Sequence, residues 1–442
     1  MAETLFPIPE PEPPRGEVAE PAGAPRLVCP NRAQVELRAV DLEGLLAADH
    51  PARAVWEFVE SLDVSPLYAQ VQSVEGRAGR PATDPRIYLA LWLWATVEGV
   101  GSARAIERLT GEHDAYRWIC GGVSVNHHSL SDFRVQQVEF LDDLLTHSVA
   151  VLMSQGLVTL ERVAQDGMRV RASAGAASFR RRPTLQRALK EAQEQIERLR
   201  AELEEDPEAT KRRQVAARRR TAEDRQRRVA EALEQMIEVE AKKKSAAERE
   251  TARVSTTDPQ ARVMKMADGG FRPAYNTQFA VDTETQVVVG VDVSNRGSDQ
   301  GQLVPMLEQL EARYGKRPSQ GLVDGGFVAL DEIETATIQG TEVYAPVAKP
   351  KDPHRDPHTP LPEDTPCVAA WRQRMGSAEA KEIYKLRAAT VECVNAIARN
   401  RGFQRFWVRG RQKARAVALW YAITHNMMRG LALNQAPALA AA

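Results

Sequence analysis

Residues 163–175 read VAQDGMRVRASAG, and this stretch marks the point where the pattern of the chain changes. Before it, apolar residues recur at helical spacing, whereas Met168 to Ala172 alternate between apolar and basic residues as a β-strand does. Its single acid, Asp166, ends a short apolar run and is followed at once by glycine. The pattern predicts a strand that ends at Asp166 with Gly167 turning the backbone, although Asp-Gly is also an ordinary turn dipeptide.

The region before this stretch, residues 51–156, has the apolar spacing of helices. Its most apolar segment, DPRIYLALWLWATVEG (residues 84–99), is too short to cross a membrane and is expected to be a buried helix. Two shorter helical segments follow. We interpret them as a helix-turn-helix that presents Ser131, Arg134 and Gln137 to DNA; the alternative is a packing domain whose polar face meets water.

The region after residue 156 alternates between strands and helices. Residues 275–281 and 287–293 alternate in polarity around the turn DTET, which predicts a β-hairpin. GSDQGQLVPMLEQLEARYGK then predicts a helix that begins at Ser298 and Asp299 as caps and ends near Gly315. GLVDGGF and TEVYAPVA are predicted strands on either side of another helix, so the fold class is α/β.

A charged insertion interrupts this domain at residues 183–253. Its first half has a coiled-coil seam, Asp206-Pro207 breaks it, and a second, arginine-rich helix follows, which predicts a helical hairpin. The arginines of the second helix fit either DNA phosphates or a solvated charged face, and the sequence leaves both open. The seam consists of Leu185, Leu189, Ala192, Ile196, Leu199 and Leu203.

Composition narrows the class of protein only modestly. The net charge is -1, so the overall charge balance indicates no partner. The four cysteines form no CxxC pair, which argues against a disulfide framework or a cysteine zinc site and fits a reducing cytoplasm. The first residues are rich in proline and acids, unlike a signal peptide, and predict a disordered leader.

Two further acids have settings that relate them to Asp166. Asp324 in GLVDGGF also follows a short apolar run and precedes glycine, which would place it at the carboxyl edge of a sheet, where ligand sites of α/β proteins form. Glu392 lies in EIYKLRAATVECVNAIARNRG, which predicts an α-helix with Tyr384, Arg387, Glu392, Asn395 and Arg399 in one arc. The plainer interpretation of that arc is a surface stripe of ion pairs.

Three carboxylates from two strand ends and a helix suit one particular chemistry. Mg²⁺ prefers hard oxygen ligands, and two such ions, or two Mn²⁺ ions, activate the attacking hydroxyl and stabilise the leaving oxygen of a phosphodiester. Arg169 and Arg171 share one face of the predicted strand and are expected to contact phosphate.

On these segments the chain resembles the DDE transposases of bacterial insertion sequences, in the group with a Tyr-Arg-Glu-Lys signature around the third acid. The resemblance covers residues 51–431 and rests on VAQDGMRVRASA, PAYNTQFAVD, LVDGGF and YKLRAATVECVNAIARNRGFQRFWVRGRQKARAVALWYAITHN, preceded by HHSLSDFR. It implies a ribonuclease H-like core with a mixed sheet, dependence on divalent metal ions, and binding to terminal inverted repeats.

The signature carries over onto particular residues. The resemblance implies that Asp166, Asp324 and Glu392 are the catalytic, metal-binding acids. Tyr384 and Arg387 match the first two positions of the signature, and Arg399 stands where lysine is usual. Four residues separate Arg387 from Glu392, where the commonest form of the signature has three. The expected DNA contacts are Tyr384, Arg387 and Arg399 of the signature, together with Arg169, Arg171, Ser131 and Arg134.

The sequence therefore predicts a transposase that cleaves at terminal inverted repeats and transfers the strand into target DNA. It would act on nucleoid DNA in the cytoplasm, as a homodimer or larger assembly on DNA, without a membrane. The alternatives are a domesticated, non-catalytic DNA-binding protein and a metal-dependent nuclease that never transposes. The expected domains are a leader (1–50), a helical DNA-binding domain (51–156), a catalytic domain (157–182 and 254–430), the coiled-coil insertion (183–253) and a tail (431–442).

Overall fold

The computed structural model describes residues 41–76, 81–205, 209–350, 352 and 354–440, together with 33, 35 and 39. Most of the predicted leader and the predicted break at Asp206-Pro207 therefore lie outside the described residues. Within the described ranges, no helix combines the length and apolarity that a bilayer crossing requires.

The amino-terminal region is helical, as predicted. The helix α3 (Pro85–Val97) begins at Asp84, whose side chain accepts a hydrogen bond from the Arg86 N–H, and nearly all of its residues are buried. The predicted buried helix is thus confirmed. The other elements here are η1 (Glu43–Leu45), α1 (Pro51–Glu60), α2 (Ser65–Tyr68), α4 (Ala103–Glu112), α5 (Asp114–Cys120), α6 (His127–Gln136) and α7 (Val138–Ser154).

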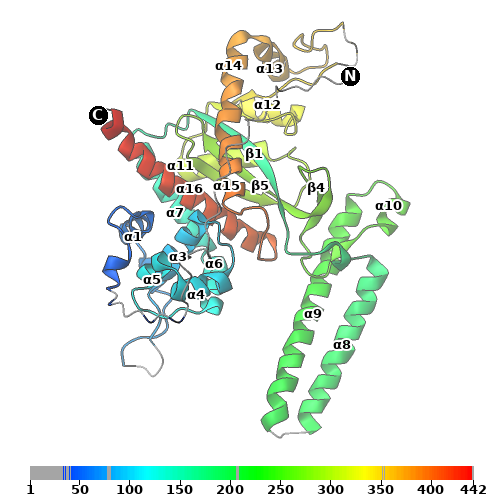
Figure 1. Cartoon of the computed structure of the whole chain (residues 1–442). Coiled ribbons are helices and arrows are strands. Elements are labelled where there is room, and N and C mark those ends of the chain that lie inside the picture. Colours follow the sequence, from blue (N-terminus) through cyan, green and yellow to red (C-terminus); the bar gives the residue numbers. More distant parts are fainter. Residues whose placement is uncertain are drawn as a thin grey trace, which may run out of the picture. The chain divides into compact units, whose positions relative to one another are not determined.

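The central sheet of the described chain has six strands in mixed orientation (Figure 1). The strand β1 (Arg162–Arg171) is antiparallel to β5 (Phe271–Asp282) and parallel to β7 (Gln320–Leu322). Outside them, β6 (Val288–Ser294) and β4 (Arg262–Lys265) pair with β5, and β8 (Glu342–Tyr344) pairs with β7. The predicted hairpin is β5 and β6, and this mixed sheet is compatible with a ribonuclease H-like core.

The strand β1 corrects the opening prediction. Asp166 does not end the strand but lies inside it, paired with Phe279, and Gly167 continues the strand opposite Gln278. The Asp-Gly pair therefore makes no turn. The reason is that β5 pairs with β1 along its whole length, so backbone hydrogen bonding carries the strand past the acid.

The helices of this region differ from prediction in two places. The helix α11 (Leu303–Tyr314) ends at Gly315 as expected, but it begins four residues after Asp299, which caps nothing. The long signature helix is α14 (Ala378–Arg387), a π-helical turn η3 (Ala388–Glu392) and α15 (Cys393–Asn400), not one regular α-helix. The remaining helices are α12 (Leu330–Ile338), α13 (Pro366–Gly376) and α16 (Arg411–Ala440).

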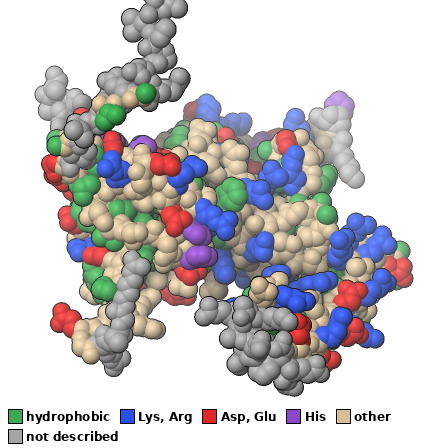
Figure 2. Space-filling view, turned by 60° about the horizontal axis from the view of Figure 1, so that its bottom comes forward, with side chains coloured by type: hydrophobic (Ala, Val, Ile, Leu, Met, Phe, Trp, Pro, Cys, Tyr) green, Lys and Arg blue, Asp and Glu red, His purple; other side chains and the backbone are tan. Residues whose placement is uncertain are grey.

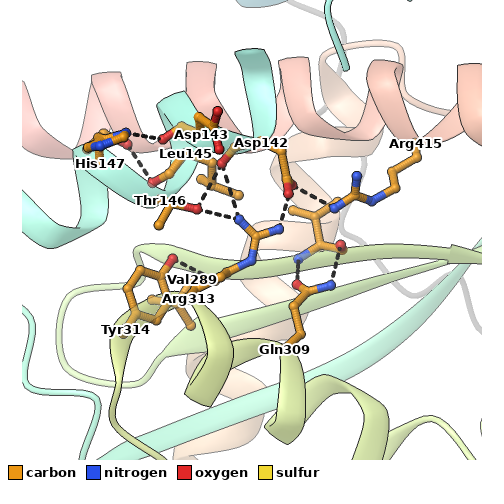
Figure 3. Close-up of polar contacts among 12 residues, drawn as sticks. Asp142, Asp143, Leu145, Thr146, His147, Val289, Gln309, Arg313, Tyr314 and Arg415 are labelled. Atoms are coloured by element: carbon orange, nitrogen blue, oxygen red, sulfur yellow. Dashed lines mark hydrogen bonds and ion pairs between the residues drawn. The ribbon is translucent and has the colours of Figure 1, made fainter. Parts of the chain in front are cut away.

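One hydrophobic core runs through the amino-terminal helices and the sheet region. Trp92 of α3 lies 6.4 Å from Trp420 of α16, ring centroid to ring centroid, and the Trp420 indole donates a hydrogen bond to the carbonyl of Arg134. The contact between α7 and the sheet region is polar as well. Figure 3 shows Asp142 of α7 held by Arg313 and Arg415, at 2.5 and 2.6 Å.

The insertion consists of two long helices, α8 (Arg182–Glu205) and α9 (Ala209–Ala241), which pack along each other (Figure 1). Near its base, Leu185, Val229 and Met236 form a separate small core with Val254. Short elements join it to the sheet region: η2 (Ala176–Ser178), β2 (Phe179–Arg180), α10 (Ala246–Glu250) and β3 (Val254–Ser255).

Candidate active site

Two of the predicted acids converge at one edge of the sheet. Ala164 of β1 pairs with Leu322 of the parallel strand β7. Asp166 and Asp324 each lie two residues further on, so both reach the same edge of the sheet. Asp324 follows the carboxyl end of β7, as predicted, and its Oδ1 accepts the Gly326 N–H at 2.7 Å. Asp166 reaches this edge from the middle of its strand because β7 is much shorter than β1.

The carboxylate of Asp166 is fixed by two hydrogen bonds. Its Oδ1 accepts the Gly167 N–H, and its Oδ2 accepts from the amide of Asn395, both at 2.9 Å. Burial raises the pKa of Asp166 to about 6; the guanidinium of Arg387 opposes this rise and the carboxylate of Asp324 adds to it. An ionised Asp166 is therefore costly here unless more positive charge is supplied.

The third acid, Glu392, is held by a cation that all three acids share. Its carboxylate accepts a hydrogen bond from Arg387, whose side chain is largely buried while that of Glu392 is half exposed. Burial by itself lowers the pKa of Arg387, but Tyr384 and the three acids raise it above its usual value. Arg387 is thus the positive charge that this acidic site contains.

The π-helical turn explains how the unusual spacing in the signature is accommodated. In an α-helix, residues five apart point about 140° away from each other. A π-helical turn joins residue i to i+5 and places such residues on one face. Because residues 388–392 form this turn, Arg387 and Glu392 meet in spite of the extra residue between them.

A fourth acid, Asp299, lies beside the pair and was not identified from the sequence. Its side chain is 4% exposed, and its Oδ1 accepts hydrogen bonds from Asn276 and Gln278 of β5 at 2.7 and 2.8 Å. Its Oδ2 pairs with Arg169 at 2.7 Å. The sequence did contain a signal for this acid's environment, because Asn276 and Gln278 are polar residues on one face of β5. The apolar residues that alternate with them made the segment resemble an ordinary half-buried strand.

Asp299 also explains why glycine follows Asp166. A Cβ at Gly167 would lie 2.0 Å from the Oδ1 of Asp299 and 2.5 Å from the amide of Gln278. Gly167 is therefore required for space, because the buried network around Asp299 packs directly on the backbone of β1.

The other predicted contacts lie in different environments. Arg169 is turned toward Asp299, whereas Arg171 and Arg399 are exposed. Arg134 is buried: its guanidinium donates to the carbonyl of Gly101 at 2.7 Å and lies over Trp92. Burial lowers the pKa of Arg134 to about 10.

Three of the predicted DNA contacts remain: Ser131 and Gln137, which are close to Arg134 in the sequence, and Tyr384 of the signature. Ser131 is only partly buried, and Gln137 is buried against Gln70. Tyr384 is partly buried and lies under the guanidinium of Arg387. The predicted recognition face of α6 therefore points partly into the core, since Arg134 and Gln137 lie there.

The donor set suits a hard divalent cation, although among the described residues no three acidic, histidine or cysteine side chains are placed to hold a metal ion together. Asp166 and Asp324 supply carboxylate oxygens, the ligands that a hard divalent cation prefers, and the buried Asp166 has a raised pKa, so a bound cation would favour its ionised form. Glu392 is paired with Arg387.

The fold and the site define a mixed α/β protein with acids gathered at one sheet edge. Residues 40–136 match the family described as Transposase domain (DUF772), and residues 246–428 match the Transposase DDE domain. The chain belongs to the DDE transposases of insertion sequences. The second match contains Asp324 and Glu392, whereas Asp166 lies outside both matches. No curated protein and no solved structure matches this chain.

Proposed function

We propose that this chain cleaves DNA at the terminal inverted repeats of an insertion sequence and transfers the freed strand into target DNA. The observation that carries the proposal is the convergence of Asp166 and Asp324 from neighbouring parallel strands, with Glu392 paired to Arg387, whose charge opposes the rise in the pKa of Asp166. The family match supports a transposase, and the three acids supply a reason for its chemistry.

Asp166, Asp324 and Glu392 would hold two Mg²⁺ or Mn²⁺ ions. When bound, such ions lower the pKa of an attacking hydroxyl and stabilise the leaving oxygen of a phosphodiester. Asn395 keeps the Asp166 carboxylate oriented through its 2.9 Å hydrogen bond. No covalent intermediate with the protein is needed, because water attacks first and the released 3′-hydroxyl then attacks the target.

Arg387 has two tasks in this proposal. Without metal it neutralises the acids, and with DNA present its guanidinium is available to a phosphate once it leaves Glu392. The ring of Tyr384 packs against the guanidinium of Arg387. Arg399 is exposed at the end of α15. These three residues of the Tyr-Arg-Glu-Lys type signature would hold the DNA around the reacting phosphate.

The remaining parts have proposed roles as well. The ribonuclease H-like catalytic domain would comprise residues 157–182 and 254–430, and the helical domain at 51–156 would contribute DNA contacts. Ser131 remains a candidate contact there. Strand transfer of two ends onto one target would require a homodimer or larger assembly on nucleoid DNA.

The test is metal-dependent cleavage and strand joining by the full chain, with DNA that carries the ends of its own element. Asp166→Asn, Asp324→Asn and Glu392→Gln should each reduce both reactions by at least about 10³-fold, because each removes a charged metal ligand. Asp268→Asn is the control, since this exposed acid contacts Arg272 and the Gly270 N–H and the variant should react as the unchanged protein does.

Three results would contradict the proposal in different ways. Intact reactions in all three variants would exclude the acids as metal ligands. Cleavage without joining would indicate a nuclease that never transposes. DNA binding without any metal-dependent cleavage would indicate a non-catalytic DNA-binding protein.

A further inference from the structure

Two arginine-rich regions of the described chain differ in how their charges are compensated. On the helical hairpin, Arg218 pairs with Glu202 and Arg225 with Glu191 across the two helices, and Arg228 pairs with Asp224. Figure 2 shows acidic and basic side chains interspersed over this hairpin. Its positive charge is therefore largely cancelled locally, which favours the solvated-face interpretation of the arginine run.

The segment at residues 399–413, from the end of α15 to the start of α16, has the opposite character. Within the part of the chain that the structure describes, none of its cations forms an ion pair within 4.0 Å of a carboxylate. Most of them are exposed, and no acidic residue occurs among them in the sequence. The cations are Arg399, Arg401, Arg405, Arg409, Arg411 and Lys413.

The backbone of this segment is firmly attached to the catalytic sheet. Arg171 of β1 donates its N–H to the carbonyl of Gln404 at 3.0 Å, and its own carbonyl accepts the Phe406 N–H at 2.8 Å. Further on, the Gly410 N–H donates to the buried Asp258 at 3.2 Å. The segment is thus joined to the end of β1 by an isolated parallel bridge between Arg171 and Arg405.

Burial alternates along residues 405–409. Phe406 and Val408 are buried, whereas Arg405, Trp407 and Arg409 are exposed. Arg171, which is also exposed, pairs directly with Arg405 in the parallel bridge. We call Arg171, Arg405, Trp407 and Arg409 the cationic strip.

Trp407 is unusual among the seven tryptophans of the chain, all of which lie in the described ranges. It alone is exposed, at 58%. The guanidinium carbon of Arg405 lies 5.2 Å from its ring centroid, and a Cβ at Gly101 would lie 3.0 Å from its pyrrole edge. An indole that is supported at one edge and flanked by arginine offers a surface on which a nucleobase can stack.

We propose that the cationic strip binds the DNA that flanks the reacting phosphate, with its arginines against phosphates and Trp407 stacked on a base. This inference rests on the proposed function, because it takes DNA as the substrate at Asp166. Arg171 lies five residues along β1 from Asp166, which separates their backbones by about 16 Å, and the odd spacing directs the two side chains to opposite faces of the strand. The strip would therefore contact DNA away from the reacting phosphate and not at it.

The experiment compares matched charge changes in the two arginine-rich regions of the full-length protein. Binding is measured by fluorescence anisotropy in EDTA, at several salt concentrations, on a labelled duplex of about 30 base pairs with a single-stranded extension of about 10 nucleotides. Arg405→Ala with Arg409→Ala should weaken binding at least tenfold and reduce the salt slope by about two. Arg218→Ala with Arg225→Ala should change binding less than about twofold, because these arginines are already paired.

Trp407 is tested on the same probe. Trp407→Ala should weaken binding roughly tenfold, and Trp407→Phe should retain most of the affinity because it keeps an aromatic face. Thermal unfolding of both variants controls for the packing of Trp407 against Gly101.

The proposal is overturned if the strip variants bind and depend on salt as the unchanged protein does, or if the hairpin variants lose as much affinity as the strip variants. Metal-dependent cleavage by the unchanged protein is assayed in parallel. Strip-dependent binding without such cleavage would refute the proposed function alone, and cleavage with a dispensable strip would refute this inference alone.

Discussion

The candidate active site has a strand half and a helix half that are built differently. In the strand half, Asp166 and Asp299 lie in a buried network in which each carboxylate has at least two hydrogen-bond partners. In the helix half, Glu392 is half exposed and has one partner, Arg387, on the far side of a π-helical turn. The strand half is a rigid base, whereas the helix half carries an acid that one cation holds and can release.

The two halves should therefore respond differently to substitution. Changes in the strand half should alter folding, since added atoms or lost charges there have no solvent to accommodate them. Changes at the half-exposed Glu392 should alter metal binding with little loss of stability. The following predictions test this contrast.

Gly167→Ala should have the largest effect. Its Cβ would lie 2.0 Å from the Oδ1 of Asp299, so we expect a loss of stability of about 3 kcal/mol or more together with loss of cleavage. Thermal unfolding measures the first effect. Gly175→Ala is the control, because a Cβ at Gly175 would meet nothing within 4 Å. Unchanged stability of Gly167→Ala would show that the strand half adapts.

Asp299→Asn should follow, with a loss of about 2 kcal/mol, because it removes the buried partner of Arg169 while keeping the shape. Chemical denaturation measures the free energy of unfolding. Asp268→Asn removes an exposed ion pair and should leave stability unchanged. If Asp299→Asn kept full stability but lost cleavage, Asp299 would belong to the chemistry and not to the scaffold.

Arg387→Gln should change metal binding clearly. Removal of the shared cation should strengthen Mn²⁺ binding several-fold in the absence of DNA, because the acids lose the charge that competes with the metal. Electron paramagnetic resonance of free Mn²⁺ reports this directly. Lys385→Gln, on the same helix but paired with the exposed Glu382, is the control. Weaker Mn²⁺ binding by Arg387→Gln would contradict the release of Glu392 by this cation.

Deletion of Ala389 should have the smallest effect. It shortens the π-helical turn to an α-helical one and brings Arg387 and Glu392 to a spacing at which they still share a face. Cleavage should stay within about threefold of the unchanged protein. Deletion of Ala396 in the regular helix α15 should abolish cleavage, because it rotates all that follows by about 100°. Equal loss in both deletions would show that the π-helical turn itself is needed.

Local patterns sufficed for much of the fold. The buried helix at Ile87 to Val97, the hairpin of β5 and β6, and the end of α11 at Gly315 follow from apolar period and turn residues, and all three occur. The ends of the strands were harder to predict, because the length of β1 depends on its pairing with β5, and the paired residues lie more than 100 positions apart in the sequence. For the same reason, the end of the short apolar run at Asp166 did not reveal that the strand continues.

The functional residues show the same limit. Asp299 has the local appearance of a helix cap, yet Asn276, Gln278 and Arg169 of two other strands surround it. Arg134 has the local appearance of a recognition residue, yet it packs on Trp92 in the core. Neither placement can be derived from neighbours in the chain, because the partners that decide it are distant in sequence.

The order of the elements, the candidate acids and the unusual spacing of the signature follow from residue type and local period, so they can be predicted from the chain alone. The space that Gly167 leaves for Asp299, the π-helical turn that restores the pairing of Arg387 and Glu392, and the compensation of particular arginines are visible only in the folded protein. Space, burial and charge pairing belong to side chains that folding brings together from distant parts of the sequence.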